Sequence, residues 1–148
     1  LPDSRAISSF IELADLDFKS WDELAEKLNN EELRKLAIEQ GGIVLKYEDV
    51  IGKRVIANSA EAVEFEGYKT LAINYPNFFA STLGHLLCQQ LPPMGIVWSQ
   101  RRNKRVFSLR SDGTVDVGLI AKKYGGGGHK AAAGFSLEIN QPMPWTTK

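Results

Sequence analysis

The segment KKYGGGGHKAAAGF, residues 122–135, contains four consecutive glycines with a Lys-Tyr pair before them and a His-Lys pair after them. Glycine loses more conformational freedom on folding than any other residue, so such a run needs a structural or chemical reason. Successive glycine N–H groups can converge on an anion and let a phosphate approach the backbone closely. The segment therefore predicts a phosphate-binding cradle, with a flexible surface loop as the alternative. Its candidate ligands are Gly126, Gly127, Gly128 and His129.

The first glycine of the run has a purely structural interpretation. Gly125 directly follows a helix expected over residues 117–124, where a left-handed residue commonly ends a helix. The run is not a dinucleotide-binding G-x-G-x-x-G motif, because that motif follows a strand and opens a helix. It is not a P-loop either, because a P-loop requires Gly-Lys-Ser/Thr. Only the later three glycines are therefore candidates for ligand binding.

A second set of candidate residues lies in the strand-like segment RVFSLRS, residues 105–111. Side chains alternate between the two faces of a strand, so Phe107 and Leu109 point one way and Ser108 and Arg110 the other. Arginine suits phosphate because its planar fork donates two parallel hydrogen bonds. A solvated arginine is the alternative interpretation.

Several segments together resemble a known domain: SLRS (108–111), DV (116–117), the GGGH and KAAAGF segments, and the upstream VEFEGYKTLAINYP. They are similar to the C-terminal DHH-associated domain, subfamily 1, of the DHH phosphoesterase superfamily. The resemblance covers residues 60–140, and the long helix before it resembles the connector of those enzymes. The superfamily includes single-strand exonucleases, nanoRNases and cyclic-dinucleotide phosphodiesterases, and a related domain occurs in alanyl-tRNA synthetases.

This resemblance implies that the domain grips a nucleotide substrate while another domain cuts it. By position, Arg110 would be a phosphate clamp, with Ser108 beside it on the strand. The later three glycines, Gly126 to Gly128, would form a backbone cradle, and His129 would donate to a phosphate or a base. The implied partners are a single-stranded oligonucleotide or a small (di)nucleotide, together with a DHH catalytic domain in a longer protein.

A catalytic centre is not evident in the sequence. Metal-dependent phosphoesterases need clustered Asp and His ligands, whereas this chain has 2 histidines and no Asp-His-His segment. Asp15 and Asp17 fall on different helix faces, which indicates solvated charge. We expect no catalytic residue and no metal ligand here, and we expect this chain alone to be inactive. The resemblance implies manganese or magnesium only for the catalytic half that this sequence lacks.

The expected fold is mixed α/β, with a helical N-terminal connector over residues 1–60. Ser20 would cap a helix over residues 21–28, and a long helix would begin after Asn30, with Gly41-Gly42 a possible break. Residues 61–140 would form the DHH-associated domain, a mixed β-sheet flanked by helices, and residues 141–148 a loose tail.

Within that domain the sequence predicts alternating strands and helices. Residues 68–75 read as a strand, after which Asn77 would cap a helix that ends before Pro92-Pro93. Residues 94–100 and 105–111 read as a β-hairpin, and residues 134–139 as a last strand. Asp116 would cap the helix that leads into the glycine run.

Composition is that of an ordinary globular protein, with 148 residues, 43% apolar and 24% charged. The lone Cys88 excludes a disulfide framework, and no apolar stretch approaches the ~20 residues of a membrane span. We therefore expect a soluble, cytoplasmic protein without membrane contact. The chain begins at Leu1 rather than methionine, so we expect a piece of a longer polypeptide.

Charge is unevenly distributed although the net charge is zero. Residues 1–66 hold 8 Lys and Arg against 15 Asp and Glu, net −7, and residues 67–148 hold 10 against 3, net +7. This asymmetry favours an anionic partner for the C-terminal part. The leading hypothesis is a nucleotide- or oligonucleotide-binding module that serves phosphodiester hydrolysis. The alternatives are a free-standing nucleic-acid-binding protein and a tRNA-related domain.

Overall fold

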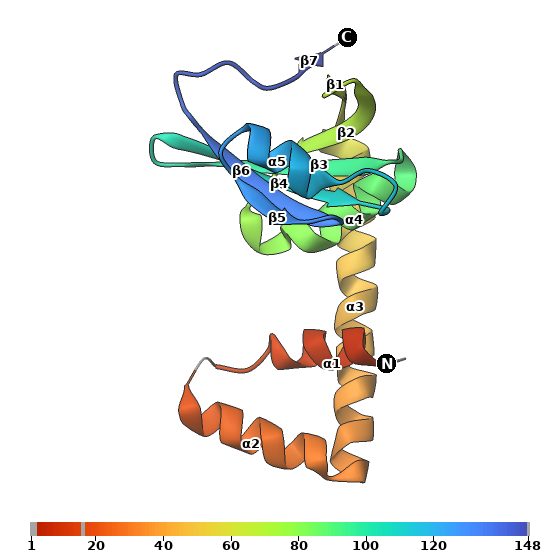
Figure 1. The fold of residues 1–148 in the computed structure, drawn as a ribbon. Coiled ribbons are helices and arrows are strands. Elements are labelled where there is room, and N and C mark those ends of the chain that lie inside the picture. Colours follow the sequence, from red (N-terminus) through yellow and green to blue (C-terminus); the bar gives the residue numbers. More distant parts are fainter. Residues whose placement is uncertain (1–2, 16, 148) are drawn as a thin grey trace. The chain divides into compact units, whose positions relative to one another are not determined.

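A computed structural model of the chain describes residues 3–15 and 17–147, which divide into two compact units, residues 1–51 and 52–148 (Figure 1). The first contains α1 (Ser4–Ile11), α2 (Phe18–Asn29) and most of α3 (Glu31–Ser59). Within residues 3–15 and 17–147, no helix combines the length and the apolar character that crossing a membrane requires.

The start of α2 differs from the sequence prediction. Asp17, not Ser20, is the N-cap, and its carboxylate accepts hydrogen bonds from the Ser20 backbone N (2.9 Å) and from Ser20 Oγ (2.8 Å). The backbone bond, followed by the hydroxyl bond, lowers the pKa of Asp17. An aspartate that can reach the third N–H of a helix is a strong cap, so the helix starts earlier than the hydrophobic pattern indicates.

Helix α3 begins as predicted and does not break at its glycine pair. The Asn30 Oδ1 accepts from the backbone N of Glu32 (3.0 Å) and of Leu33 (3.1 Å). A Cβ at Gly41 would lie 1.8 Å from the Ala6 carbonyl oxygen. Gly41 therefore lets α1 approach the backbone of α3 closely.

The second unit is a mixed sheet of strands in the order β5-β6-β4-β3-β2-β1-β7 (Figure 1). Strands β2 and β3 are parallel and the other pairs are antiparallel, which confirms the mixed α/β class. The strands are β1 (Glu61–Phe65), β2 (Tyr68–Asn74), β3 (Met94–Arg101), β4 (Lys104–Ser111), β5 (Gly127–His129), β6 (Ala132–Glu138) and β7 (Thr146–Thr147). The predicted hairpin of β3 and β4 is confirmed.

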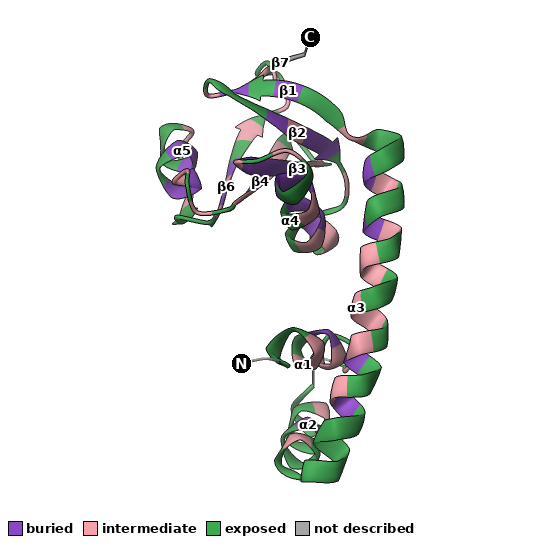
Figure 2. Cartoon of the chain, turned by 90° about the vertical axis from the view of Figure 1, so that its right-hand side faces the viewer, coloured by how far each residue is buried: buried purple, intermediate pink, exposed green. Residues whose placement is uncertain are grey.

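Two helices cover opposite faces of this sheet. Helix α4 (Ala80–Gln90) packs on β2, β3 and β4, where Leu83 and Leu87 meet Ile73 and Val97. Helix α5 (Val117–Lys123) packs on β4, β5 and β6, over Phe107 and Phe135. Figure 2 shows buried positions on both helices and on the strands between them. We call the two sides of the sheet the α4 face and the α5 face.

Two local predictions in this unit are wrong. Asn77 does not cap α4, because a short 3-10 helix, η1 (Asn77–Phe79), precedes that helix and its N-cap is Phe79. The last segment is not a loose tail in its described part. Trp145 packs edge-on against Phe107 with ring centroids 5.6 Å apart, and β7 pairs with β1. Burial of a large aromatic side chain holds this segment on the sheet.

Candidate phosphate-binding face

Strand pairing places the predicted site residues in two neighbouring rows. Arg110 on β4 pairs with Ala132 on β6, which pairs with His129 on β5. Ser108 pairs in the same way with Gly134, which pairs with Gly127. Directly opposed residues of antiparallel strands share a face, as do residues two apart in one strand. Both rows therefore lie on one face, with Arg110 and His129 about 10 Å apart across two strand spacings.

That face is the α4 face, and it is open over β5 and β6. Val97 pairs with Ser108 and belongs to the cluster under α4, which fixes the side of the sheet. Helix α4 contacts β2, β3 and β4, while α5 contacts β5 and β6 from the opposite side. A Cβ built at Gly127 meets nothing within 4 Å, and His129 is exposed. The two rows thus form an accessible strip of sheet surface beside α4, which we call the glycine face.

Arg110 is held at the edge of α4. A Cβ at Gly84 of α4 would lie 2.8 Å from Cγ of Arg110 and 3.2 Å from its Cβ, so Gly84 makes room for the arginine stem. Nη1 of Arg110 donates to the Leu109 carbonyl oxygen at 3.0 Å. Packing of the stem and this hydrogen bond restrict the side chain, which reduces the entropy that ligand binding would cost.

Burial also gives Arg110 an electrostatic property suited to anions. The side chain is half-buried, and desolvation lowers the pKa of Arg110 from its ordinary value. Across the described ranges 3–15 and 17–147, no carboxylate forms an ion pair with it. A partly dehydrated guanidinium without a carboxylate gains more from an incoming phosphate than a fully hydrated one, because the local dielectric is lower.

Ser108 lies between Arg110 and the loop that precedes α4. Its Oγ donates to Oδ1 of Asn77 at 2.9 Å. This bond ties η1 to β4. The sequence analysis missed Asn77 as a site residue because Asn before a helical pattern indicates a cap.

The glycine run does not form the expected nest of converging N–H groups. Gly126 N donates to the Ala121 carbonyl (2.9 Å) and Gly125 N to the Lys122 carbonyl (3.1 Å), which is the Schellman pattern that ends α5. Gly125 has φ 74°, as predicted for its position after the helix. Gly127 to His129 then form β5. The end of α5 uses the N–H of Gly126, and Gly127 and Gly128 lie in the edge strand β5.

Different contacts therefore explain why glycine occupies each of the positions 126, 127 and 128. A Cβ at Gly126 would lie 2.2 Å from the Gly134 carbonyl oxygen, and one at Gly128 would lie 2.5 Å from Cα of Ala133. Gly128 also has φ 145°, which favours glycine. Of these three, Gly127 alone faces open space, and beside it Gly134, a strand-interior glycine, leaves the surface without a side chain. Such a glycine often marks close approach by a ligand or by another backbone, and a Cβ at Gly134 would lie 2.7 Å from the Phe107 carbonyl oxygen of β4.

Residues after β5 anchor the site to α5. The carbonyl oxygen of Lys130 accepts from Val117 N at 3.0 Å, and that of Ala131 accepts from Ser111 N at 3.0 Å. Asp116 caps α5 as predicted, with its carboxylate accepting from Leu119 N at 3.0 Å. The β5–β6 turn is thereby fixed on both sides, and His129 stands on a supported edge strand.

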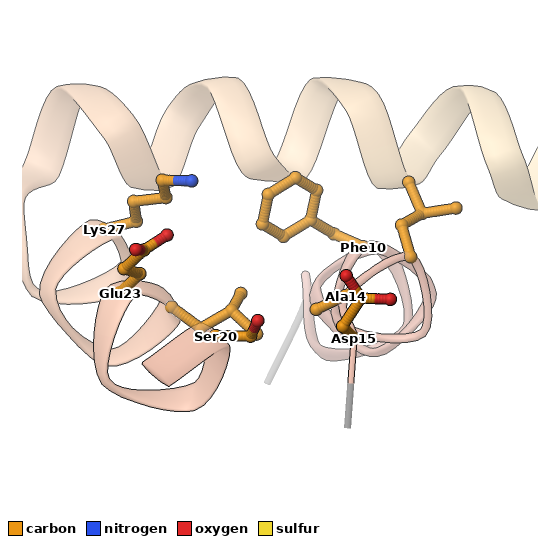
Figure 3. A pocket seen from close by; sticks show the side chains of 8 residues that line it. Phe10, Ala14, Asp15, Ser20, Glu23 and Lys27 are labelled. Carbon is orange, nitrogen blue, oxygen red and sulfur yellow. The ribbon is translucent and has the colours of Figure 1, made fainter. Parts of the chain in front are cut away.

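The acidic side chains that the structure describes in the first unit, within residues 3–15 and 17–51, are not grouped as ligands of a metal ion. A hollow of about 270 Å³ is lined by Asp15, Glu23 and Lys27 together with the apolar Phe10. Figure 3 shows these side chains. Among all residues that the structure describes, no group of three or more His, Cys, Asp or Glu side chains could hold a metal ion. The described acidic side chains of this unit therefore provide no fitting ligand set for manganese or magnesium.

A model of a known protein family matches a large part of the second unit. The family model described as DHHA1 domain matches residues 80–142. This match spans α4, the β3–β4 hairpin, α5 and the whole glycine face. The C-terminal part of the chain carries a DHHA1 domain. The family resemblance expected from the glycine segment is thereby confirmed.

Related proteins extend the comparison beyond the DHHA1 domain. An uncharacterized protein of Acanthamoeba polyphaga mimivirus is 30% identical over 141 residues, which cover 90% of this chain and 32% of the relative. The chain thus spans about a third of the length of that relative.

Solved structures show similarity of fold. A pGpG-specific phosphodiesterase, PggH from Vibrio cholerae, matches with a TM-score of 0.55 at 13% identity, over 93% of this chain and 51% of that one. The DHH domain of a protein described as a member of a family of ribosomal proteins is also similar, at 16% identity and a TM-score of 0.47. That match covers 70% of this chain and 29% of the other. Because the second TM-score lies below 0.5, only the first match bears on this chain, and at 13% identity it shows similarity of fold alone.

Proposed function

We propose that the DHHA1 domain binds a phosphate group of a nucleotide or short oligonucleotide on its glycine face. The observation that carries this proposal is the row of Arg110, Ala132 and His129, with the row of Ser108, Gly134 and Gly127 beside it. The two donors flank small residues, so an anion can lie against the sheet between them.

Each member of the face has a distinct chemical role. The Arg110 guanidinium would bind phosphate oxygens bidentately, because its fork matches their spacing. His129 would donate a ring N–H to a phosphate or a base. Ala132, Gly127 and Gly134 would keep side-chain atoms out of the space that the ligand fills. The surplus of basic residues after residue 66 would attract the anion over a longer range.

We further propose that this binding serves phosphodiester hydrolysis by a DHH catalytic domain. Support comes from the DHHA1 domain itself and from the fold shared with a protein described as a pGpG-specific phosphodiesterase. The residues described here lack a metal-ligand cluster, so manganese or magnesium and the hydrolytic step would belong to the catalytic domain. This chain would position the substrate.

Binding of a 5′-phosphorylated dinucleotide to wild type and Arg110→Gln tests the proposal. Loss of the charge-assisted hydrogen bonds should cost about 1.5–3 kcal/mol of binding free energy. Lys69→Gln is the matched control, because it removes one exposed positive charge from β2, outside the glycine face. Equal losses in both variants would indicate diffuse attraction and would contradict the proposed site. A strong preference for folded tRNA would instead support the tRNA-related alternative.

A further inference from the structure

A second surface feature adjoins the glycine face. A groove of about 480 Å³ lies between residues 74–78 and residues 98–101. Tyr75 N donates to the Trp98 carbonyl oxygen at 2.9 Å, which continues the β2–β3 pairing to the mouth of the groove. Ser99 and Arg101 lie two and four residues beyond Val97, so they share the α4 face with the glycine face.

The groove carries an exposed aromatic ring. Phe78 is 83% exposed, although phenylalanine is among the residues most often buried. Its ring centroid lies 6.3 Å from that of Tyr75 and 6.3 Å from that of Phe79. Both neighbours contact the ring at tilted angles, 57° for Tyr75 and 46° for Phe79, while most of the Phe78 side chain faces solvent. Such an exposed ring can stack on any nucleobase, because every base has a π-face.

A cation accompanies this ring. Arg101 is exposed and lines the groove, and it forms no ion pair with a carboxylate within residues 3–15 and 17–147. Its cross-strand neighbour Lys104 differs, because Nζ of Lys104 lies 3.3 Å from Oε1 of Glu138. An aromatic platform beside a cation is the arrangement that binds single-stranded nucleic acid, in which bases are free to stack and the backbone is anionic.

The groove and the glycine face are physically connected. Asn77, next to Phe78, accepts the hydrogen bond from Ser108 of the glycine face at 2.9 Å. Ser99 in the groove pairs with Val106, which lies four residues from Arg110 along β4 and therefore about 13 Å away. A stacked strand rises about 3.4 Å per nucleotide, so this distance corresponds to about four stacked nucleotides, or fewer in an extended strand.

We infer that the groove with Phe78 and Arg101 is a second subsite, which binds nucleotides of a single-stranded oligonucleotide whose phosphate is held at Arg110. This inference rests on the proposed function. It goes further by assigning the ligand class: a single strand longer than a dinucleotide. Since about 13 Å along β4 separates Arg110 from the position that pairs with Ser99, a stacked dinucleotide held at Arg110 would cover about half of this distance, whereas a hexanucleotide would span it.

Fluorescence anisotropy with 5′-phosphorylated oligodeoxythymidylates of two and six nucleotides, labelled at the 3′ end, tests the subsite. Wild type should bind the hexamer about 5- to 150-fold more tightly than the dimer, the range that corresponds to stacking of one base. Phe78→Ala should remove this gain and leave dimer binding unchanged. Arg101→Ala should reduce the salt dependence of hexamer binding alone.

Matched controls come from the first unit. Phe18 is 93% exposed on α2, so Phe18→Ala removes an equally exposed ring without touching the groove, and it should leave both affinities unchanged. Equal hexamer affinity in wild type and Phe78→Ala would overturn the subsite while Arg110-dependent dimer binding still supported the proposed function. Absence of Arg110-dependent dimer binding would overturn the proposed function itself. Thermal melts of each variant would verify folding.

Discussion

Gly127 and Gly126 are adjacent in sequence, yet their substitution should have opposite effects on stability. A side chain at Gly127 would project into open space, whereas a Cβ at Gly126 would lie 2.2 Å from the Gly134 carbonyl oxygen and 2.6 Å from Cβ of Phe135. Gly127→Val should raise the free energy of unfolding by about 0.4–1 kcal/mol, because it restricts the unfolded chain and valine suits a strand. Gly126→Ala should lower it by about 1–3 kcal/mol through overpacking.

Gly127→Val should weaken phosphate binding although it stabilises the fold. Valine at position 127 would fill the space between the rows of the glycine face, so phosphate could no longer lie against the sheet. Loss of one charge-assisted hydrogen bond already corresponds to about 1.5–3 kcal/mol, or tenfold and more in affinity. Urea unfolding and dinucleotide titration of Gly127→Val measure the two effects separately. A stable Gly127→Val protein that binds the dinucleotide like wild type would refute a ligand role for this face.

Two further predictions concern the contacts that hold the sheet. The pKa of Glu66 is lowered by hydrogen bonds, first from Lys123 and then from Tyr124, whose hydroxyl lies 2.7 Å from Oε1. The ionised Glu66 therefore stabilises the fold fully above the ordinary carboxyl pKa, and this stabilisation is lost as pH falls through the lowered pKa. Glu66→Gln should therefore lower the free energy of unfolding at pH 7 by about 1 kcal/mol, and this free energy should then fall less steeply below about pH 4. Urea unfolding at pH 7 and below pH 4 measures both effects. An equally steep fall in wild type and variant would contradict this prediction. Trp145→Ala should lower the free energy of unfolding by about 3 kcal/mol, because the Trp145 ring packs against Phe107, Phe65 and Trp98. A loss below about 0.5 kcal/mol in the same urea assay would show that the C-terminal segment around Trp145 is loosely held.

Local patterns predicted the elements whose signals are themselves local. The cap by Asp116, the left-handed Gly125 and the hairpin of β3 and β4 depend on neighbouring residues, and all are observed. Alternation along β4 also placed Ser108 and Arg110 on one face correctly, because side-chain period in a strand is fixed.

Features that depend on distant contacts could not be predicted in the same way. The Gly126 N–H is used by the end of α5, and β5 exists because β6 pairs with it. Asn77 meets Ser108 across 31 residues of sequence, and Trp145 is held by aromatic rings of other strands. Contacts between residues far apart in the sequence determine each of these features, and a short stretch of sequence does not contain both partners.

Backbone amide NMR during titration with a 5′-phosphorylated dinucleotide tests the central claim most directly. Amides of the glycine face should shift first and most: Ser108, Arg110, Gly127, His129, Ala132 and Gly134. Those of α5, on the opposite face of the sheet, should shift less, and those of α1 and α2 should not shift. Shifts that concentrate on α5 or in the first unit, with the glycine face unchanged, would contradict the account.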